Sequence, residues 1–343
     1  MPPLFTGKRV LITGICGTVG YELASLLLTE HGIAEVIGID HNENELAFRQ
    51  QQLAAFGPVR VFLGDVRDAG MLVRRTRGID VVFHTAACKH VDMCEISPME
   101  AVQTNILGTQ SVIEACLANG VQQVVFTSTD KAVNPTNVMG TSKLMGERLM
   151  TAAAIQAGAN SCFVSTRFGN VMGSRGSVIP IFRRQIRAGG PVTVTDPAMT
   201  RFIMSLRTAV RLVIESVGVG RSGDVVVTKM PAVRVIDLAE VMISECAPLC
   251  GRRPQDIPIE IIGTKPGEKT FEELVNDEEV RRALELSKYL VVRPALMPSK
   301  DWKVDYPDVI TFDVVKPYTS EAEPKLTKDQ LAEILSQHGL LHD

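Results

Sequence analysis

An acidic and a basic side chain stand side by side where an apolar run of the chain ends. Asp130 and Lys131 follow the strand-like segment 123–127, and Thr129 precedes them. A carboxylic acid and an amine in contact form a coupled pair that suits a reaction moving protons between carbon and oxygen. The same residues fit a plainer interpretation, in which Thr129 caps a helix and Asp130–Lys131 is a surface ion pair.

If this pair acts as an acid and a base, its surroundings must shift the pKa values of both side chains. Asp130 must hold a proton near neutral pH, so desolvation must raise its pKa, whereas the pKa of Lys131 must be lowered. The two can then exchange one proton. A second lysine, Lys143, follows four residues after Met139. The thioether of Met139 is no proton donor and at most a weak acceptor, so it adds no acid or base.

Three glycines, Gly14, Gly17 and Gly20, lie at three-residue spacing between a strand-like run and a helical segment. Such glycines allow a tight turn and let the backbone approach a pyrophosphate. A helical segment is predicted over 20–30, and its N-terminus offers free N–H groups to the phosphates; Thr18 and Val19, just before it, are further cofactor contacts. The turn therefore predicts a dinucleotide site.

Asp40 ends the next strand-like run, where a carboxylate binds the adenosine ribose hydroxyls and disfavours a 2′-phosphate. NAD is therefore favoured over NADP. Asp65 and Val66 follow the strand 59–63, and Asp65 fits either an adenine contact or a helix N-cap. The turn containing Ala86 should pass the cofactor.

These residues need a sheet to bring them together. Apolar strand-like runs at 9–13, 35–40, 59–63, 80–84 and 123–127 alternate with helical segments. This alternation predicts an α/β protein with a Rossmann-type, doubly wound parallel sheet. We expect residues 1–166 to form the NAD-binding domain. Residues 167–343 should form mainly a smaller C-terminal α/β substrate lobe, with later segments able to return to the first domain.

Composition excludes several classes of function. The chain has 343 residues, a formal net charge of −3 and 45% hydrophobic residues. A chain with this slightly negative net charge is not expected to bind nucleic acid. No apolar run is long enough to span a membrane. With no signal peptide in view, we expect a cytoplasmic protein. The seven cysteines lack zinc-site spacing, although Cys88 with Cys94, or Cys246 with Cys250, could be read as metal ligands; buried, reduced thiols and no metal are expected.

Several motifs occur in the order found in one enzyme family. They are TGICGTVG, HTAACKHVDMCE, TNILGT, STDKAVNPTNVMGTSK, TRFGNVMGSRGSVIP, DPAMTRF and KPGEKTFEEL. With them the chain resembles the extended short-chain dehydrogenase/reductases that act on nucleotide sugars, specifically the NDP-N-acetylglucosamine 4,6-dehydratase branch of polysaccharide biosynthesis. Met139 occupies the position of the usual tyrosine, a departure that some dehydratases of this branch share.

The resemblance implies a reaction and assigns roles. A tightly bound NAD⁺ takes the C4 hydride, water is lost across C5 and C6, and the hydride returns to C6, so the cofactor is recycled. The resemblance makes Asp130 the acid at the 6-hydroxyl and Lys131 the base at C5. Thr129 would hydrogen-bond O4, and Lys143 would orient the nicotinamide ribose. No residue is assigned to the O4 proton.

The resemblance also points to a substrate site for a nucleotide sugar, with UDP-GlcNAc favoured over GDP and dTDP sugars. Lys89 would contact sugar or phosphate, whereas the neighbouring His90 is expected to be structural. Asn170 would bind near the phosphates or sugar, and Lys269 lies in a loop near the phosphate end. Arg175, Arg201 and Arg207 suit the diphosphate, because guanidinium groups bind phosphate oxygens in pairs; each also fits a plain surface charge.

Two other hypotheses stay open. An epimerase on the same scaffold is disfavoured because C4 epimerisation needs no acid for a leaving hydroxyl, although C5 inversion could accompany dehydration. A non-catalytic sensor of NAD or nucleotide sugars would explain the missing tyrosine, but the retained Lys143 and the Thr129–Lys131 triplet oppose it. The resemblance further implies a homo-oligomer, formed through the helices after the fourth and fifth strands.

Overall fold

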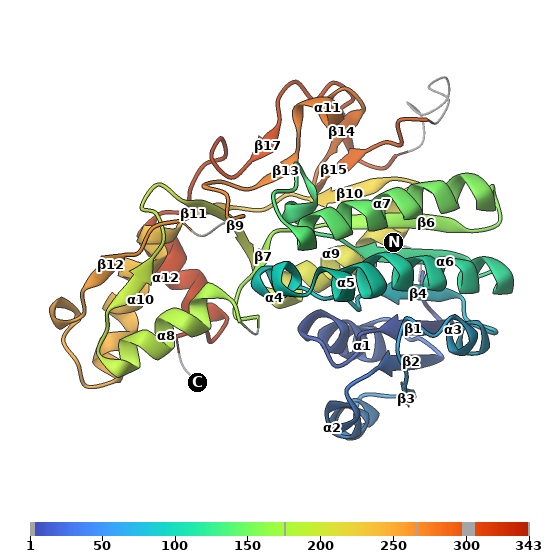
Figure 1. Cartoon of the computed structure of the whole chain (residues 1–343), viewed down its shortest axis with the longest axis horizontal. Coiled ribbons are helices and arrows are strands. Elements are labelled where there is room, and N and C mark those ends of the chain that lie inside the picture. Colours follow the sequence, from blue (N-terminus) through green and yellow to red (C-terminus); the bar gives the residue numbers. More distant parts are fainter. Residues whose placement is uncertain (1–3, 175, 265–266, 297–305, 342–343) are drawn as a thin grey trace. The chain divides into compact units, whose positions relative to one another are not determined.

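A computed structural model describes residues 4–174, 176–264, 267–296 and 306–341. The chain divides into two compact units (Figure 1). Unit 1 runs to Phe168 and also takes in Val210–Lys229 and Val275–Pro317. Unit 2 consists of Gly169–Ala209, Met230–Leu274 and the segment from Tyr318 onward. The chain therefore leaves unit 1 three times and returns to it twice.

Unit 1 is built on a ten-stranded sheet in the order β16-β14-β15-β10-β6-β5-β4-β1-β2-β3. The order 3-2-1-4-5-6 within it is that of a doubly wound dinucleotide-binding sheet, so the predicted Rossmann-type α/β fold is confirmed. The parallel strands are β1 (Arg9–Thr13), β2 (Glu35–Asp40), β3 (Val59–Leu63), β4 (Val81–His84), β5 (Gln123–Thr127), β6 (Cys162–Arg167) and β10 (Val225–Thr228).

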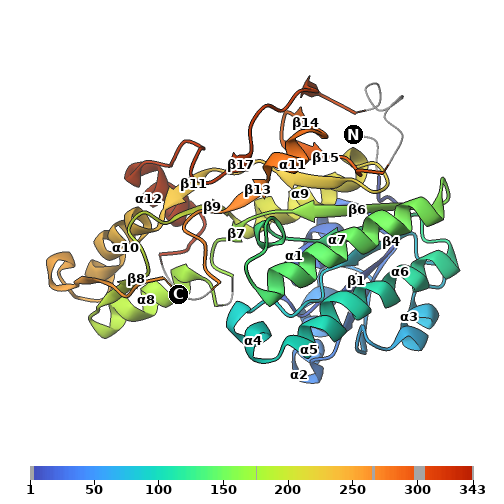
Figure 2. The same cartoon turned by 45° about the horizontal axis from the view of Figure 1, so that its top comes forward.

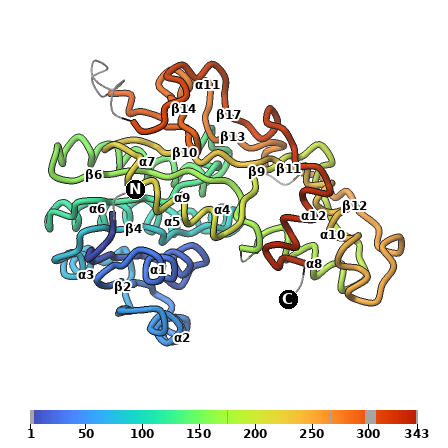
Figure 3. Tube along the Cα trace, turned by 180° about the vertical axis from the view of Figure 1, so that it is seen from behind, coloured from blue at the N-terminus to red at the C-terminus, as the bar shows by residue number. Residues whose placement is uncertain are grey.

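The C-terminal part of unit 1 completes one edge of this sheet. β15 (Tyr289–Val292) pairs antiparallel with β10, and β14 (Ala283–Leu286) pairs antiparallel with β15 (Figure 3). β16 (Val309–Thr311) then pairs with β14. Strands from distant parts of the sequence thus lie side by side in a single sheet.

Helices follow the parallel strands as right-handed crossovers require. α3 (Ala69–Arg75), α6 (Gly108–Asn119) and α7 (Val138–Ala157) pack side by side on one face of the sheet (Figure 2). The other helices of the N-terminal half are α1 (Thr18–Glu30), α2 (Glu43–Ala54), α4 (Val91–Ile96), α5 (Pro98–Ala101) and the π-helical η1 (Val102–Leu107). α9 (Leu206–Val219) and the short α11 (Asp277–Val280) follow later in the chain.

The apolar pattern located four of the five predicted strands to the residue. The predicted strands 9–13, 35–40, 59–63 and 123–127 have the bounds of β1, β2, β3 and β5. These runs are predictable because strands covered on both faces need apolar side chains throughout; β4, for example, is buried along its whole length. Helix starts were less accurate, since α1 begins at Thr18 instead of the predicted Gly20.

In its described residues, unit 2 contains three small sheets, three α-helices and the 3-10 helix η3 (Pro254–Asp256). The sheets are β11-β9-β7 (Ala232–Arg234, Thr200–Met204, Asn170–Val171), β12-β8 (Ile259–Ile261, Val192–Val194) and β13-β17 (Glu273–Val275, Tyr318–Thr319). The helices α8 (Val178–Ala188), α10 (Val235–Leu249) and α12 (Lys328–Gln337) share one apolar core that includes Phe182, Met242 and Leu331. The predicted capping box of α12, Thr327 with Gln330, is confirmed. No helix in the described part of the chain is long and apolar enough to cross a membrane.

The outer edge of the sheet at β3 is partly occupied by a side chain. The amide of Gln50 on α2 accepts a hydrogen bond from the Val61 N–H at 2.9 Å and donates one to the Val59 carbonyl at 3.1 Å. These are backbone groups that a further strand would otherwise use. Gln50 therefore closes part of the edge.

His84 ends β4 in the interior of unit 1 and joins two other elements. Its Nδ1 lies 2.7 Å from Thr13 Oγ1 on β1, and its Nε2 lies 3.0 Å from Thr109 Oγ1 on α6. Burial, together with the nearby Lys143, lowers the pKa of His84 to about 3. The ring is therefore neutral near pH 7, where it hydrogen-bonds the residue that precedes the glycine-rich turn.

We expect His84→Phe to lower the free energy of unfolding at pH 7 by about 1–3 kcal/mol, because two buried threonine hydroxyls lose a partner. Its pH dependence should also change. The unfolded chain protonates His84 more readily than the native protein, so wild-type stability falls as pH drops below 6.5 towards 3. The variant lacks this contribution. Urea unfolding between about pH 4 and 8 measures both effects; parallel curves for the two proteins would contradict the assignment.

Candidate active site

The glycine-rich turn lies directly against the chain that follows β4. Gly14 has φ +73°, and a Cβ there would lie 2.7 Å from the Ala86 nitrogen. A Cβ on Gly20 would lie 2.3 Å from the Gly14 carbonyl oxygen. Larger residues would push these backbones apart. Gly17 occupies the N-cap of α1 without a side-chain cap, which leaves the first N–H groups, at Thr18 and Val19, for an anion.

Asp40 is held at the rim of this turn. Its Oδ2 accepts a hydrogen bond from the Cys16 N–H at 3.0 Å, and its Oδ1 accepts one from the Asn42 N–H at 3.1 Å. The side chain is nearly buried, at 8% exposed. The predicted acid at the end of β2 is thus fixed beside the glycines.

Asp65 does not cap a helix. α3 begins at Ala69, and its N-cap is Asp68, whose side chain accepts a hydrogen bond from the Met71 N–H. The N-cap alternative for Asp65 was therefore wrong. Its carboxylate instead binds the Arg67 side chain and backbone, and the hydrogen bonds from Arg67 lower the pKa of Asp65. Val66 beside it is buried and meets α6 at Gly108.

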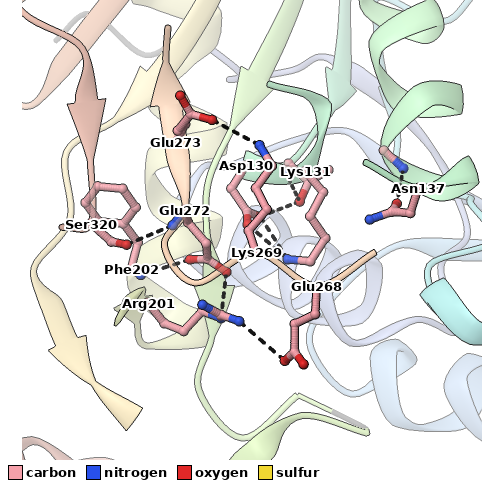
Figure 4. Close-up of polar contacts among 12 residues, drawn as sticks. Asp130, Lys131, Asn137, Arg201, Phe202, Glu268, Lys269, Glu272, Glu273 and Ser320 are labelled. Carbon is pink, nitrogen blue, oxygen red and sulfur yellow. Dashed lines mark hydrogen bonds and ion pairs between the residues drawn. The ribbon is translucent and has the colours of Figure 1, made fainter. Parts of the chain in front are cut away.

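The Thr129–Lys131 segment forms a compact polar turn after β5. Thr129 Oγ1 donates to Asp130 Oδ1 at 2.6 Å, and Lys131 Nζ lies 2.9 Å from Asp130 Oδ2 (Figure 4). The Asp130 side chain is 2% exposed and that of Lys131 is 33% exposed. Thr129 does cap the short 3-10 turn η2 (Asp130–Ala132), as the plainer interpretation held. The pair itself is not a surface pair, because the carboxylate is buried.

Lys143 lies on α7 beneath this turn and is buried. Its Nζ is 4.0 Å from the centre of the Phe126 ring on β5. Burial lowers the pKa of Lys143 to about 7, although Glu147 opposes the shift. Met139, one helical turn earlier, packs with Cys94 and Ala101 in a small apolar cluster. The position where the family's tyrosine is expected therefore carries no acid–base group.

Sequence reasoning missed two residues that support this region. Asn105 in the π-helical η1 is 1% exposed; its amide bonds both backbone groups of Cys88 and donates to Ser142 Oγ at 2.8 Å. It ties the chain after β4 to α7, and a π-helical turn is a frequent marker of functional positions. Gly140 on α7 is the other: a Cβ there would lie 2.1 Å from the Lys131 carbonyl oxygen. In the sequence, the glycine that ends the NPTNVMG motif is the one sign that α7 comes this close to the Lys131 backbone.

Unit 2 holds most of the predicted substrate residues. Arg201 on β9 lies 3.4 Å from Glu268 through Nη2 and 3.4 Å from Glu272 through Nε (Figure 4). Lys269 Nζ lies 3.0 Å from Glu273 Oε2. Asn170 is half-buried in β7, and Arg207 is exposed in the first turn of α9. Arg201 is therefore more than a plain surface charge, because it joins β9 to the chain that leads into β13.

The remaining predictions have simpler outcomes. Lys89 and His90 in unit 1 are both exposed, and His90 takes the N-cap position of α4 without a side-chain cap bond. Arg175 lies outside the described residues. The seven cysteines are free thiols, and no three His, Cys, Asp or Glu side chains gather as a metal site within the described ranges.

Comparisons with known proteins show what this chain is similar to. A family model described as polysaccharide biosynthesis protein matches residues 10–294. A relative from Methanocaldococcus jannaschii, described as an uncharacterized membrane protein, is 46% identical over 291 residues, covering 84% of this chain and 87% of the relative. A UDP-glucose 4-epimerase of Rickettsia canadensis is 40% identical over 294 residues, covering 83% of each chain.

Solved structures extend the likeness to three dimensions. Pen from Bacillus thuringiensis is 39% identical with a TM-score of 0.88, covering 97% of this chain and 98% of that one. DesIV, a dTDP-glucose 4,6-dehydratase from Streptomyces venezuelae solved with NAD bound, is 25% identical with a TM-score of 0.66, covering 76% and 86%. The chain is thus similar to nucleotide-sugar dehydratases and epimerases, as its motifs predicted.

We expect Gly140→Ala to destabilise the protein, although alanine is the better helix former. The added methyl meets the Lys131 carbonyl at 2.1 Å, and such overpacking typically costs about 1–3 kcal/mol. Gly70→Ala on α3 is the matched control, because its nearest atoms lie 3.4 Å away on the side chains of Arg74 and Asp68. Thermal unfolding measures both variants. Equal stability of the two would show that α7 does not press on Lys131.

Proposed function

This chain belongs to the polysaccharide biosynthesis protein family, and from that premise we propose that it is an NAD-dependent nucleotide-sugar 4,6-dehydratase, with UDP-GlcNAc as the favoured substrate. The contact between the buried Asp130 carboxyl and Lys131 Nζ, 2.9 Å apart at the end of β5, carries the proposal. Elimination of water needs an acid for the leaving hydroxyl and a base for a carbon-bound proton. The described turn offers both.

The cofactor assignment rests on the close packing around Gly14 and Gly20, where added side chains would fill the backbone cradle. Gly14, Gly17 and Gly20 with the α1 N-terminus would hold the pyrophosphate, Asp40 the ribose hydroxyls, and Asp65 and Val66 the adenine side. NAD in the DesIV structure supports the same choice. Bound NAD supplies a hydride acceptor for C4 and a donor for C6, so it is recycled and stays tightly bound.

The residues of the turn divide the proton transfers between them. Lys131 removes the C5 proton, and Asp130 protonates the leaving 6-hydroxyl, which departs as water. Once C6 has been reduced, Lys131 gives its proton back to C5, which restores the neutral amine. Thr129 binds O4, and Lys143 binds the nicotinamide ribose. The proton that O4 loses on oxidation, for which no residue is assigned, replaces the one that Asp130 gave up. The net loss is then one hydroxyl and one proton, which is one water.

The substrate's diphosphate suits the basic residues of unit 2. Arg201 has a guanidinium whose planar donors match phosphate oxygens, and Arg207, Lys269 and Asn170 are the further candidates. Arg175 completes the set predicted from sequence, and Lys89 from unit 1 would contact sugar or phosphate. Arg201 already contacts two carboxylates, so a phosphate there would compete with Glu268 and Glu272 for its donors.

A 4-epimerase is the second candidate. It is supported by the Rickettsia canadensis relative, which carries that name at 40% identity. Epimerisation at C4 needs hydride transfer but no acid at a 6-hydroxyl, so it leaves the Asp130–Lys131 contact without a purpose. The two reactions differ in the mass of their products, which makes them separable in one assay.

The purified protein should convert UDP-GlcNAc without added cofactor into a product lighter by one water and carrying a C4 ketone or its hydrate. Mass spectrometry and NMR identify this product, and denaturation should release one equivalent of NAD. An isobaric product would identify an epimerase. No turnover of UDP, GDP or dTDP hexoses together with no bound dinucleotide would favour a sensor.

Asp130→Asn and Lys131→Ala test the assigned roles within that reaction. Each should reduce dehydration by at least about 10²-fold, a typical loss for general acid–base catalysis, while the dinucleotide content stays unchanged. Asp256→Asn is the matched control, since it removes one carboxylate from an exposed pair with Arg253. Turnover like that of the wild type in either test variant would refute its role.

We further infer a homo-oligomer in solution. Large apolar side chains are exposed on α4, α5, η1 and α7, namely Met93, Ile96, Met99, Leu107 and Met145. Clustered exposed apolar residues mark interaction surfaces, and these helices follow β4 and β5. The wild type should sediment as a dimer or larger species, and Ile96→Glu with Met99→Glu should give monomers. Phe48→Glu on α2, equally exposed but elsewhere, is the control; a monomeric wild type would contradict the inference.

A further inference from the structure

The turn that carries Thr129, Asp130 and Lys131 is anchored on both sides. Before it, Ser128 donates to Glu147 Oε1 at 2.6 Å. After it, Asn134 accepts a hydrogen bond from Asn276 Nδ2 at 3.1 Å. Asn276 is the N-cap of α11 and shares a capping box with Glu279. Both anchors therefore lead to glutamates, one on α7 and one on α11.

These two glutamates meet at one arginine. Arg167 Nε and Nη2 donate to Glu147 at 2.7 and 2.6 Å, and Nη1 and Nη2 donate to Glu279, each at 2.8 Å. The three side chains are between 1% and 4% exposed. Burial alone would lower the pKa of Arg167 and raise that of Glu279. The attraction of Glu147 and Glu279 nevertheless raises the pKa of Arg167, and the attraction of Arg167, with the Asn276 backbone N–H, lowers the pKa of Glu279. We call Glu147, Arg167 and Glu279 the ion cluster.

The ion cluster is more than a means of holding three segments together. Buried ion pairs stabilise a fold weakly, because desolvation offsets their attraction. With two carboxylates and one guanidinium, the cluster carries a net charge of −1. Glu147 lies one helical turn after Lys143, a spacing at which side chains are neighbours. His84 on β4 and the Phe126 ring on β5 also lie near Lys143.

We propose that Glu147 is a positioning residue, which through the ion cluster sets the Thr129–Lys131 turn and keeps the buried Lys143 cationic. The inference rests on the proposed dehydratase function for the roles of the turn and of Lys143. Glu147 itself touches neither the reacting atoms nor the cofactor. It acts through the Ser128 hydroxyl on one side and through the charge of Lys143 on the other.

Two substitutions separate the two effects. Glu147→Gln keeps an oxygen for Ser128 but removes the charge, so the ammonium form of Lys143 loses support and its pKa falls. The alkaline limb of the kcat–pH profile should then move to lower pH by about one unit, the lower end of what a close opposite charge produces. Ser128→Ala removes only the anchor, so kcat should fall about tenfold, the equivalent of one lost hydrogen bond, with an unmoved alkaline limb and an unchanged KM.

Asp224→Asn is the matched control. Asp224 is also a buried carboxylate, but it lies before β10 and binds Tyr306 at 2.7 Å. We expect it to change thermal stability without moving the alkaline limb. If Glu147→Gln fails to fold, Glu279→Gln gives the test instead, because it also removes one negative charge from the ion cluster and should move the limb in the same direction.

An unmoved alkaline limb in the glutamine variants, with losses no greater than those of Asp224→Asn, would overturn the inference and leave the ion cluster a structural tie. Absence of dehydration by the wild type would instead refute the proposed function. In that case the pH at which bound NAD is released, measured by fluorescence in wild type and Glu147→Gln, still tests the influence of Glu147 on Lys143. Identical release profiles would overturn the inference.

Discussion

A buried guanidinium with two carboxylates is the interaction on which the site region of unit 1 depends. Arg167 ends β6, and Glu147 lies on α7. Glu279 lies on α11, 112 residues after Arg167 in the chain. Losing one partner of such a set leaves an uncompensated buried charge, which typically costs about 3–5 kcal/mol. The segment from residue 275 to 317 therefore adds two things to unit 1. It supplies the Glu279 carboxylate that pairs with Arg167, and it supplies strands β14, β15 and β16 at the sheet edge.

Helix α7 contacts the polar turn after β5 closely and also carries the charged side chains buried near it. Gly140 lets α7 approach the Lys131 carbonyl closely, and the same helix carries Lys143 and Glu147 into the interior. Lys143 is buried beneath an aromatic ring and one turn from a carboxylate, so its charge depends on neighbours instead of water. Met139, on the same helix, packs in an apolar cluster and has no group that can donate a proton.

Sequence reasoning succeeded where the signal is local. The strands, the glycine-rich turn and Asp40 follow from short patterns, because parallel strands and phosphate-binding turns impose residue types at fixed spacing. It failed where partners are distant. Arg167 was placed at the start of the predicted substrate lobe, 167–343, but its side chain binds Glu147 and Glu279 in unit 1. The pairing of Arg201 with Glu268 and Glu272 was not foreseen. Asp65 and Asp68 are equally plausible caps by type, and only the backbone at Ala69 decides between them.

The amide of Gln50 has a consequence for how copies of this chain behave in concentrated solution. A strand at the border of a sheet attracts strands from other molecules, and repeated addition of that kind leads to aggregates. Here the N–H of Val61 and the carbonyl of Val59 are already taken by a neighbouring helix. The molecule thus covers part of its own sheet edge at β3, which disfavours the addition of a strand from another copy at that edge.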